Sequence, residues 1–310
     1  MNKIVHIGMD VGSTTVKIVV MDEDLKEIYT SYERHYSDTK NTVCKVLEEL
    51  VEKYKDKEFT IALTGSGAMS TAKFLDVPFI QEVVSCKRAV EKYIPRTDVV
   101  IELGGEDAKI IYFDKSIEQR MNGTCAGGTG AFLDQMALLL DTDTQGLNEL
   151  AKKHNTIYPI ASRCGVFAKS DIQPLLNEGA AKEDIAASIF QAVVNQTISG
   201  LACGRPIKGN VAFLGGPLNY LPELRKRFIE TLKLSDDEII IPDDAHLFVA
   251  KGAALDSVNY NAINAEKLRA KIQMLKYAHD DTTVPLNPLF TVDAEYEEFK
   301  KRHEADKIRR

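Results

Sequence analysis

Several features that would mark other protein classes are missing from this sequence of 310 residues. The five cysteines include no C-x-x-C pair, which argues against a zinc ribbon or a ferredoxin-type cluster loop within one chain. Their odd number is a poor basis for a disulfide framework in a reducing compartment. The net charge is −7 and no dense Lys/Arg stripe is present, which argues against binding to nucleic acid or to anionic membrane surfaces.

Signals for secretion and membrane insertion are also missing. Met1 leads almost directly into a short apolar strand, without the h-region and cleavage site of a signal peptide. No run approaches the roughly 18 apolar residues of a membrane-spanning helix. The composition, with 44% hydrophobic and 27% charged residues, is that of an ordinary globular protein, and we expect a cytoplasmic location.

The order of apolar segments predicts an α/β protein with an internal duplication. Two apolar strands at 4–9 and 16–21 flank a turn of small polar residues, and the same strand–turn–strand unit returns at 99–113. Such a recurrence indicates two α/β lobes around a cleft. We expect the first lobe over 1–95, the second over 96–262 with its last helix closing the fold, and a charged extension over 263–310.

The turn between the first two strands has the composition of a phosphate-binding loop. Its small residues let several backbone N–H groups point at one anion, and its hydroxyl groups add donors. Asp10, at the end of the strand, could hold Mg²⁺ through water. An ordinary hairpin turn is the alternative, because the G-x-x-x-x-G-K-[ST] pattern of a P-loop is absent. The candidate nucleotide-binding residues of this turn are Gly12, Ser13, Thr14, Thr15 and Lys17.

The second turn repeats this chemistry about a hundred residues later. Gly104 and Gly105 would bind the phosphates from the opposite side of the cleft, while Glu106 and Asp107 would act with Asp10 on the metal and the attacking water. Two such turns favour a nucleotide site more strongly than either turn alone.

Two further Gly-rich segments are candidates for the same site. The strand that ends in Gly215-Gly216-Pro217 can pass close beneath a purine or ribose, although a simple strand-to-helix turn is the favoured alternative. The segment Gly128-Thr129-Gly130 opens an apolar helical pattern and could also meet phosphate.

Two cysteines stand among small residues at the predicted starts of helices. For Cys125 and Cys164 the helix dipole would favour a thiolate. For each cysteine taken alone, a buried structural thiol is the default interpretation. The other three, Cys44, Cys86 and Cys203, fit positions in a helix core or at a helix end.

Taken in order, these segments resemble a known family. The series DVGSTTVK, LGGEDAK, NGTCAGGTGAFLDQM, SRCGVFAKSDI and FLGGPLNY is similar to the ATP-dependent activators of 2-hydroxyacyl-CoA dehydratases, the activases of the BadF/BadG/BcrA/BcrD ATPase family, over roughly residues 3–260. These activators belong to the acetate and sugar kinase/Hsp70/actin superfamily. The resemblance implies an actin-like (ribonuclease H-like) ATPase fold with ATP or ADP and Mg²⁺ in the cleft.

The resemblance also implies a redox role. It predicts a homodimer with one [4Fe–4S] cluster, ligated by Cys125 and Cys164 of each chain. It predicts ATP-driven transfer of a low-potential electron from a donor such as ferredoxin or flavodoxin to a partner iron–sulfur dehydratase or reductase. Carried over by motif, the two turns match the family's phosphate loops, and residues 215–217 match its adenosine loop.

Alternatives from other classes use the same phosphate loops. A sugar or acetate-type kinase would need a catalytic Asp base and sugar-binding polar residues, which the sequence does not identify. A filament-forming actin-like protein would have no use for thiolates. The charged end from Asp293 resembles the junction in longer family members, so an N-terminal module of such a protein is a further alternative.

Overall fold

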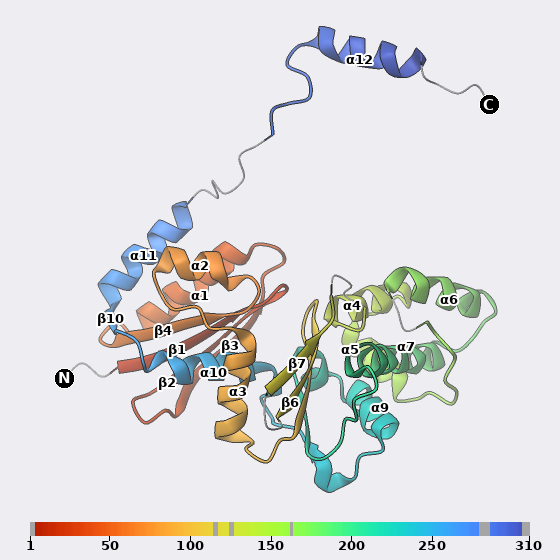
Figure 1. Ribbon diagram of the computed structural model, residues 1–310, viewed down its shortest axis with the longest axis horizontal. Helices are drawn as coiled ribbons and strands as arrows, with labels where there is room; N and C mark the ends of the chain where they lie inside the picture. Colours follow the sequence, from red (N-terminus) through yellow and green to blue (C-terminus); the bar gives the residue numbers. More distant parts are fainter. Residues whose placement is uncertain (1–3, 114–116, 124–126, 162–163, 279–285, 306–310) are drawn as a thin grey trace. The chain divides into compact units, whose positions relative to one another are not determined.

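The computed structural model describes residues 4–113, 117–123, 127–161, 164–278 and 286–305 (Figure 1). The chain divides into two compact units, residues 1–276 and 277–310. The larger unit contains two five-stranded sheets.

The first sheet is built around a strand that is buried along almost its whole length. Its strands lie in the order β10 (Ile263–Asn264), β4 (Glu58–Thr64), β1 (Ile4–Val11), β2 (Thr15–Met21) and β3 (Glu27–Arg34). β1 pairs antiparallel with β2 and parallel with β4. The continuous apolar run of β1 suits a strand that is covered on both faces.

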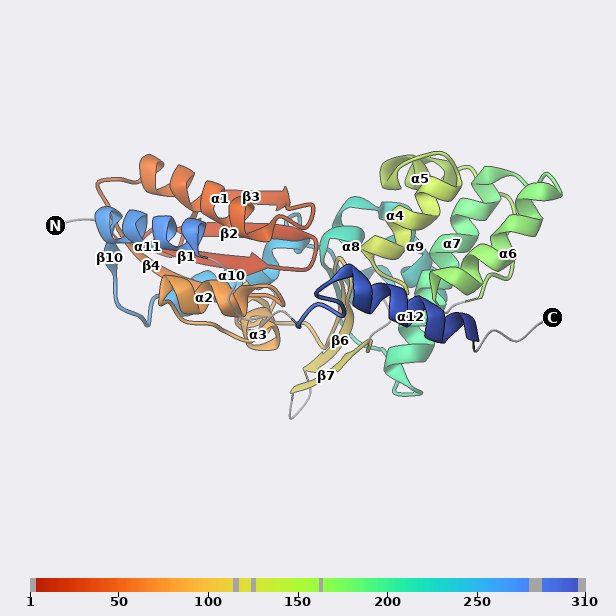
Figure 2. The same cartoon turned by 90° about the horizontal axis from the view of Figure 1, so that it is seen from above.

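Three helices cover one face of this sheet, and together with it they form what we call the first lobe. They are α1 (Thr39–Lys53), α2 (Ala68–Leu75) and α11 (Ala265–Tyr277). Their apolar side chains share one core with β1, β2 and β4. α1 and α11 lie side by side in both views, and Glu48 of α1 contacts Gln273 and Lys276 of α11 (Figures 1 and 2).

The second sheet repeats the arrangement of four strands of the first. Its strands lie in the order β7 (Ile117–Met121), β6 (Ala108–Phe113), β5 (Val99–Leu103), β8 (Val211–Leu214) and β9 (Ile239–Ile240). Only its fifth strand differs, because β9 pairs parallel with β8 whereas β10 pairs antiparallel with β4. β5 pairs antiparallel with β6 and parallel with β8, as β1 does with β2 and β4. The predicted duplication of the strand–turn–strand unit is therefore confirmed. The apolar pattern does not predict β7, because the I-E-Q-R-M sequence of this half-exposed strand contains no apolar run.

A layer of helices covers the outer face of the second sheet, and sheet and layer form the second lobe. They are α4 (Gly130–Leu139), α5 (Thr144–Ala151), α6 (Gly165–Asn177), α7 (Lys182–Thr197), α8 (Gly216–Tyr220) and α9 (Pro222–Leu232). α7 and the π-helical turn Ile198–Ala202 are long and apolar enough to cross a membrane, but 67% of the most apolar window is buried inside the unit. Here it is a core helix.

Two helices lie between the sheets and contact both of them. α10 (Phe248–Ser257) packs on β1 and β2, while α3 (Glu82–Tyr93) packs on α10 and the inner face of the second sheet. Glycines allow the close approach: a Cβ at Gly8 would lie 2.0 Å from the Ala250 carbonyl oxygen, and a Cβ at Gly252 would lie 1.7 Å from that of Ser85. The connection between the lobes is therefore a tightly packed backbone contact.

This contact predicts an unusual response to a helix-favouring substitution. Gly→Ala inside a helix normally stabilises it by up to about 1 kcal/mol. In Gly252→Ala the new methyl would overlap the Ser85 carbonyl, so we expect the free energy of unfolding to fall by about 2 kcal/mol in urea titrations. Gly123→Ala is the control, because its Cβ would meet nothing within 4 Å. A Gly252→Ala variant as stable as the wild type would contradict the described crossing.

Two boundaries differ from the expected ones. The charged extension was expected from residue 263, but α11 lies in that range and buries Leu268, Ile272 and Leu275 in the first lobe. The helix expected from Cys125 begins at Gly130, and Cys125 itself lies outside the described residues. In the smaller unit the described residues include α12 (Asp293–Ala305), whose Phe299 packs against Phe290 and His303.

Candidate functional site

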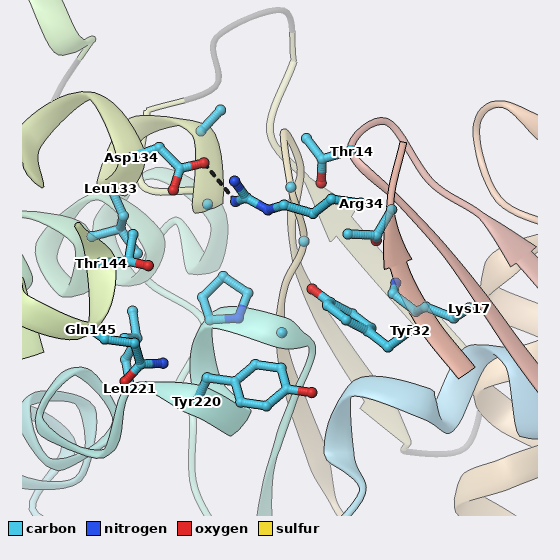
Figure 3. A pocket seen from close by; sticks show the side chains of 17 residues that line it. Thr14, Lys17, Tyr32, Arg34, Leu133, Asp134, Thr144, Gln145, Tyr220 and Leu221 are labelled. Atoms are coloured by element: carbon cyan, nitrogen blue, oxygen red, sulfur yellow. Dashed lines mark hydrogen bonds and ion pairs between the residues drawn. The ribbon is translucent and has the colours of Figure 1, made fainter. Parts of the chain in front are cut away.

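The two predicted phosphate loops face one cavity (Figure 3). They connect β1 to β2 and β5 to β6, which are the duplicated hairpins. Of the predicted nucleotide-binding residues, those that line this cavity are Thr14, Thr15, Lys17, Gly104, Gly105, Gly130, Gly216 and Pro217. Four separate stretches of the sequence thus meet at one site.

A smaller cavity, which we call the loop chamber, lies at the tips of the two loops. Asp10, Gly12 and Ser13 line it from the first hairpin, and Asp107 lines it from the second. It shares Thr14 and Lys17, among others, with the first cavity. A third cavity is lined by Ser13, Glu106 and Asp107, and it shares Ser13 and Asp107 with the loop chamber. The predicted catalytic carboxylates Asp10, Glu106 and Asp107 therefore gather in these two adjoining cavities.

The hairpins correspond residue by residue, and the correspondence reveals an acidic residue that the sequence analysis missed. In the first hairpin Asp10 is the cross-strand partner of Lys17. In the second hairpin Glu102 is the cross-strand partner of Lys109 at the same spacing. The pattern is visible in the sequence, but the segment LGGEDAK that resembles the family begins at Leu103, one residue after Glu102.

Each buried lysine is held by carboxylates. The Lys17 ammonium lies 2.6 Å from Asp10 Oδ2, and although burial opposes its charge, Asp10 raises the pKa of Lys17 above its usual value. The Lys109 ammonium lies 2.5 Å from Asp107 Oδ2 and also contacts Glu82. The loops thus carry fixed positive charge next to acidic groups.

Glu102 has the most perturbed environment of the carboxylates at the site. Burial raises its pKa to about 7, and Lys109 only partly offsets this effect. Among the described residues, no hydrogen-bond donor reaches its Oε2 atom. A buried acceptor without a donor is costly and is typical of a site that binds a further group.

Close contacts join the second phosphate loop to the first loop and to α4. A Cβ at Gly105 would lie 2.2 Å from Thr14 Oγ1 of the opposite loop. The N–H groups of Gly130 and Ala131 donate to the carbonyl oxygens of Gly104 and Gly105, at 3.0 and 2.7 Å. The first turn of α4 is therefore attached to the second phosphate loop.

Three of the predicted nucleotide-binding residues do not line any of these three cavities. Gly128, Thr129 and Gly215 lie behind the lining residues. Thr129 is fully buried as the N-cap of α4. Gly215 adopts φ 89°, and a Cβ there would lie 2.1 Å from the Leu103 carbonyl oxygen. Its conformation brings β8 against the second hairpin.

The outer part of the cavity contains side chains that the sequence analysis did not identify. Tyr32 of β3 and Tyr220 of α8 have ring centroids 5.7 Å apart, and Gln145 of α5 lies across the cavity from Tyr32 (Figure 3). Arg34 of β3 reaches Asp134 of α4 with a 2.7 Å ion pair between the lobes (Figure 3). Aromatic faces with a nearby amide suit a nucleoside better than a small acid.

Cys164 lies at the N-cap of α6, as the sequence predicts. The backbone N–H groups of Phe167 and Val166 lower the pKa of its thiol, which is half-buried. Cys44 and Cys86 are buried. In the part of the chain that the structure describes, no three His, Cys, Asp or Glu side chains are arranged to hold a metal ion, and Cys125 is not in that part.

Comparison with solved structures confirms the actin-like ATPase fold. The chain superimposes on (R)-2-hydroxyglutaryl-CoA dehydratase component A from Acidaminococcus fermentans with a TM-score of 0.72 at 29% identity, covering 86% of this chain and 99% of the other. The activator of 2-hydroxyisocaproyl-CoA dehydratase from Clostridium difficile, solved with bound ADPNP, matches with a TM-score of 0.68 at 26% identity, over 90% and 100% of the two chains.

Sequence comparison leads to the same proteins. The 2-hydroxyisocaproyl-CoA dehydratase activator of Clostridioides difficile is 33% identical over 257 residues, which are 80% of this chain and 93% of the relative. The family model for the BadF/BadG/BcrA/BcrD ATPases matches residues 7–257, which include both hairpins, α4 and Cys164. The chain therefore belongs to the BadF/BadG/BcrA/BcrD ATPase family.

Proposed function

We propose that this protein hydrolyses ATP to drive a low-potential electron onto a partner iron–sulfur enzyme of the 2-hydroxyacyl-CoA dehydratase or related reductase type. The observation that carries the proposal is the pair of opposed hairpins, each with a buried acid–lysine pair, in a chain similar to dehydratase activators. Phosphoryl transfer is catalysed mainly by positioning and by electrostatic stabilisation, and two fixed loops provide both.

The residues present suit a nucleotide with Mg²⁺. Asp10 and Glu102 face the loop chamber from opposite hairpins, and the partnerless Oε2 of Glu102 could accept from a metal-bound water. Bound Mg²⁺ would neutralise phosphate charge. Lys17 and the hydroxyls of Thr14 and Thr15 would contact phosphate oxygens, and Asp107, which lines the loop chamber, would orient the attacking water.

The thiolate environment of Cys164 suits an iron–sulfur ligand. Such clusters are bound by cysteine thiolates, usually four of them, and Cys164 with Cys125 supplies two per chain. A homodimer would supply four around a two-fold axis. We therefore propose one [4Fe–4S] cluster between two copies, reduced by a ferredoxin- or flavodoxin-like donor. α6, which Cys164 caps, begins against Gln135 and Phe132 of α4, the helix that follows Cys125 in the sequence.

Nucleotide binding can be tested by thermal unfolding. Mg²⁺ with ADP at a hundred times its Kd should add about 2.7 kcal/mol and raise the Tm by several degrees. Asp10→Asn should lose the Mg²⁺-dependent part of the shift, because it removes a buried charge at the loop chamber. Asp56→Asn, at an exposed turn, is the control. No shift with either ADP or ATP would contradict the proposal.

A further inference from the structure

One contact at the site comes from outside the two hairpins. The Lys109 side chain is only 5% exposed, and its ammonium contacts both Asp107 of its own hairpin and Glu82 of α3. Burying a charge is tolerated only when it is paired, and this lysine has two carboxylates in direct contact. Glu82 and Asp107 are therefore bound to one cation.

α3 gives Glu82 a fixed position. Glu82 is in the first turn of α3, three residues before Ser85. Ser85 is the residue whose carbonyl oxygen contacts Gly252 of α10, and α10 in turn contacts Gly8 of β1. The start of α3, which carries Glu82, is thus fixed by close backbone contacts with α10. These contacts continue from α10 to β1, the strand before the first phosphate loop.

Glu82 lies at the end of the site where the proposed terminal phosphate would bind, and it does not line the nucleotide cavity. It lines the loop chamber and the third cavity, together with Asp107. It is not among the residues that line the cavity of Tyr32 and Tyr220. A change at Glu82 can therefore alter the chemistry at the phosphate end while leaving nucleotide binding intact.

We infer that Glu82 is a positioning residue for ATP hydrolysis: through the Lys109 ammonium it holds the Asp107 carboxylate in place on the second phosphate loop. The inference rests on the proposed hydrolysis of ATP. Without Glu82, Asp107 and Glu102, the cross-strand neighbour of Lys109, compete for the same ammonium. Asp107 then loses its fixed orientation, and a small displacement of a catalytic group can lower a rate by up to about a hundredfold.

The test is the Glu82→Gln variant of the full chain, purified anaerobically and assayed with Mg²⁺ and ATP. Gln has the shape of Glu but lacks its charge. We expect kcat to fall about tenfold or more while KM and the Kd of ADP stay within about twofold, the pattern of an interaction that acts in the transition state. The Tm without nucleotide checks that the variant is folded.

Glu91→Gln is the matched control, because Glu91 lies on the same helix, is exposed and, among the described residues, pairs only with Lys87 at 3.5 Å. It should hydrolyse ATP as the wild type does. A folded Glu82→Gln variant with wild-type kcat, or one that loses kcat and ADP affinity together, would overturn the positioning role. A wild type that binds ADP but never hydrolyses ATP would instead overturn the proposed function, and the inference with it.

Discussion

Cys164→Ser, purified under strict anaerobiosis, should contain no iron, whereas the wild type should contain about four irons per dimer. The thiol lies at the N-cap of α6, where the N–H groups of Val166 and Phe167 favour the thiolate that binds metal. A serine hydroxyl keeps the N-cap but is a poor ligand for iron. Iron and sulfide analysis with the mass in solution measures the result, and Cys125→Ser should behave in the same way.

Two comparisons make this result specific. Cys203→Ser should keep its iron, because that thiol is exposed at the end of the π-helical turn and is not in a cysteine segment of the proposed cluster. Cys164→Ser should still show the ADP-dependent rise in Tm, since Cys164 does not line the nucleotide cavity. Full iron retention in Cys164→Ser, or four irons on a monomer, would refute the shared cluster.

Glu102→Gln should make the nucleotide-free protein more stable at pH 8 and leave it nearly unchanged at pH 4. Burial raises the pKa of Glu102 from 4.5 to about 7, so the folded state holds a proton that the unfolded state releases between these values. In the wild type this raised pKa makes stability fall as the pH rises from 4.5 to 7, and the full penalty remains above pH 7. At 1.36 kcal/mol per pKa unit the gain at pH 8 is roughly 3 kcal/mol.

The measurement is the free energy of unfolding in urea from pH 4 to 8, in the presence of EDTA. Glu91→Gln, an exposed carboxylate on α3, should shift stability by less than about 1 kcal/mol at every pH. The stabilised Glu102→Gln variant should hydrolyse ATP poorly, since functional groups are often kept at a cost in stability. Equal stability of wild type and Glu102→Gln at pH 8 would contradict the described burial.

The hairpins were predictable from the sequence because local signals specify them. Apolar strands on both sides of Gly-rich turns define each unit, and the repeat of the unit predicts two lobes. The N-cap position of Cys164 was predictable for the same reason, since a Gly follows it directly and opens an apolar helix. Such features depend on neighbouring residues only.

What the sequence did not reveal depends on tertiary contacts. Arg34 and Asp134 are a hundred residues apart and meet only because the lobes face each other. α11 looked like part of a charged tail, because Glu, Lys and Arg outnumber the apolar residues that it buries. Glu82 belongs to no motif, and its proximity to Lys109 comes from the packing of α3 on the inner face of the second sheet.

The way the first lobe is completed has a consequence for protein synthesis. Its sheet gains β10, and its core gains α11, only from residues 263–277, whereas the strands of the second sheet all lie within residues 99–240. A nascent chain normally folds from its N-terminus. Here the N-terminal sheet emerges first from the ribosome but finishes last, because the part of its apolar face that α11 covers stays exposed until the second lobe has been translated. During that interval the exposed β4 edge is the part of the chain that a chaperone would need to shield.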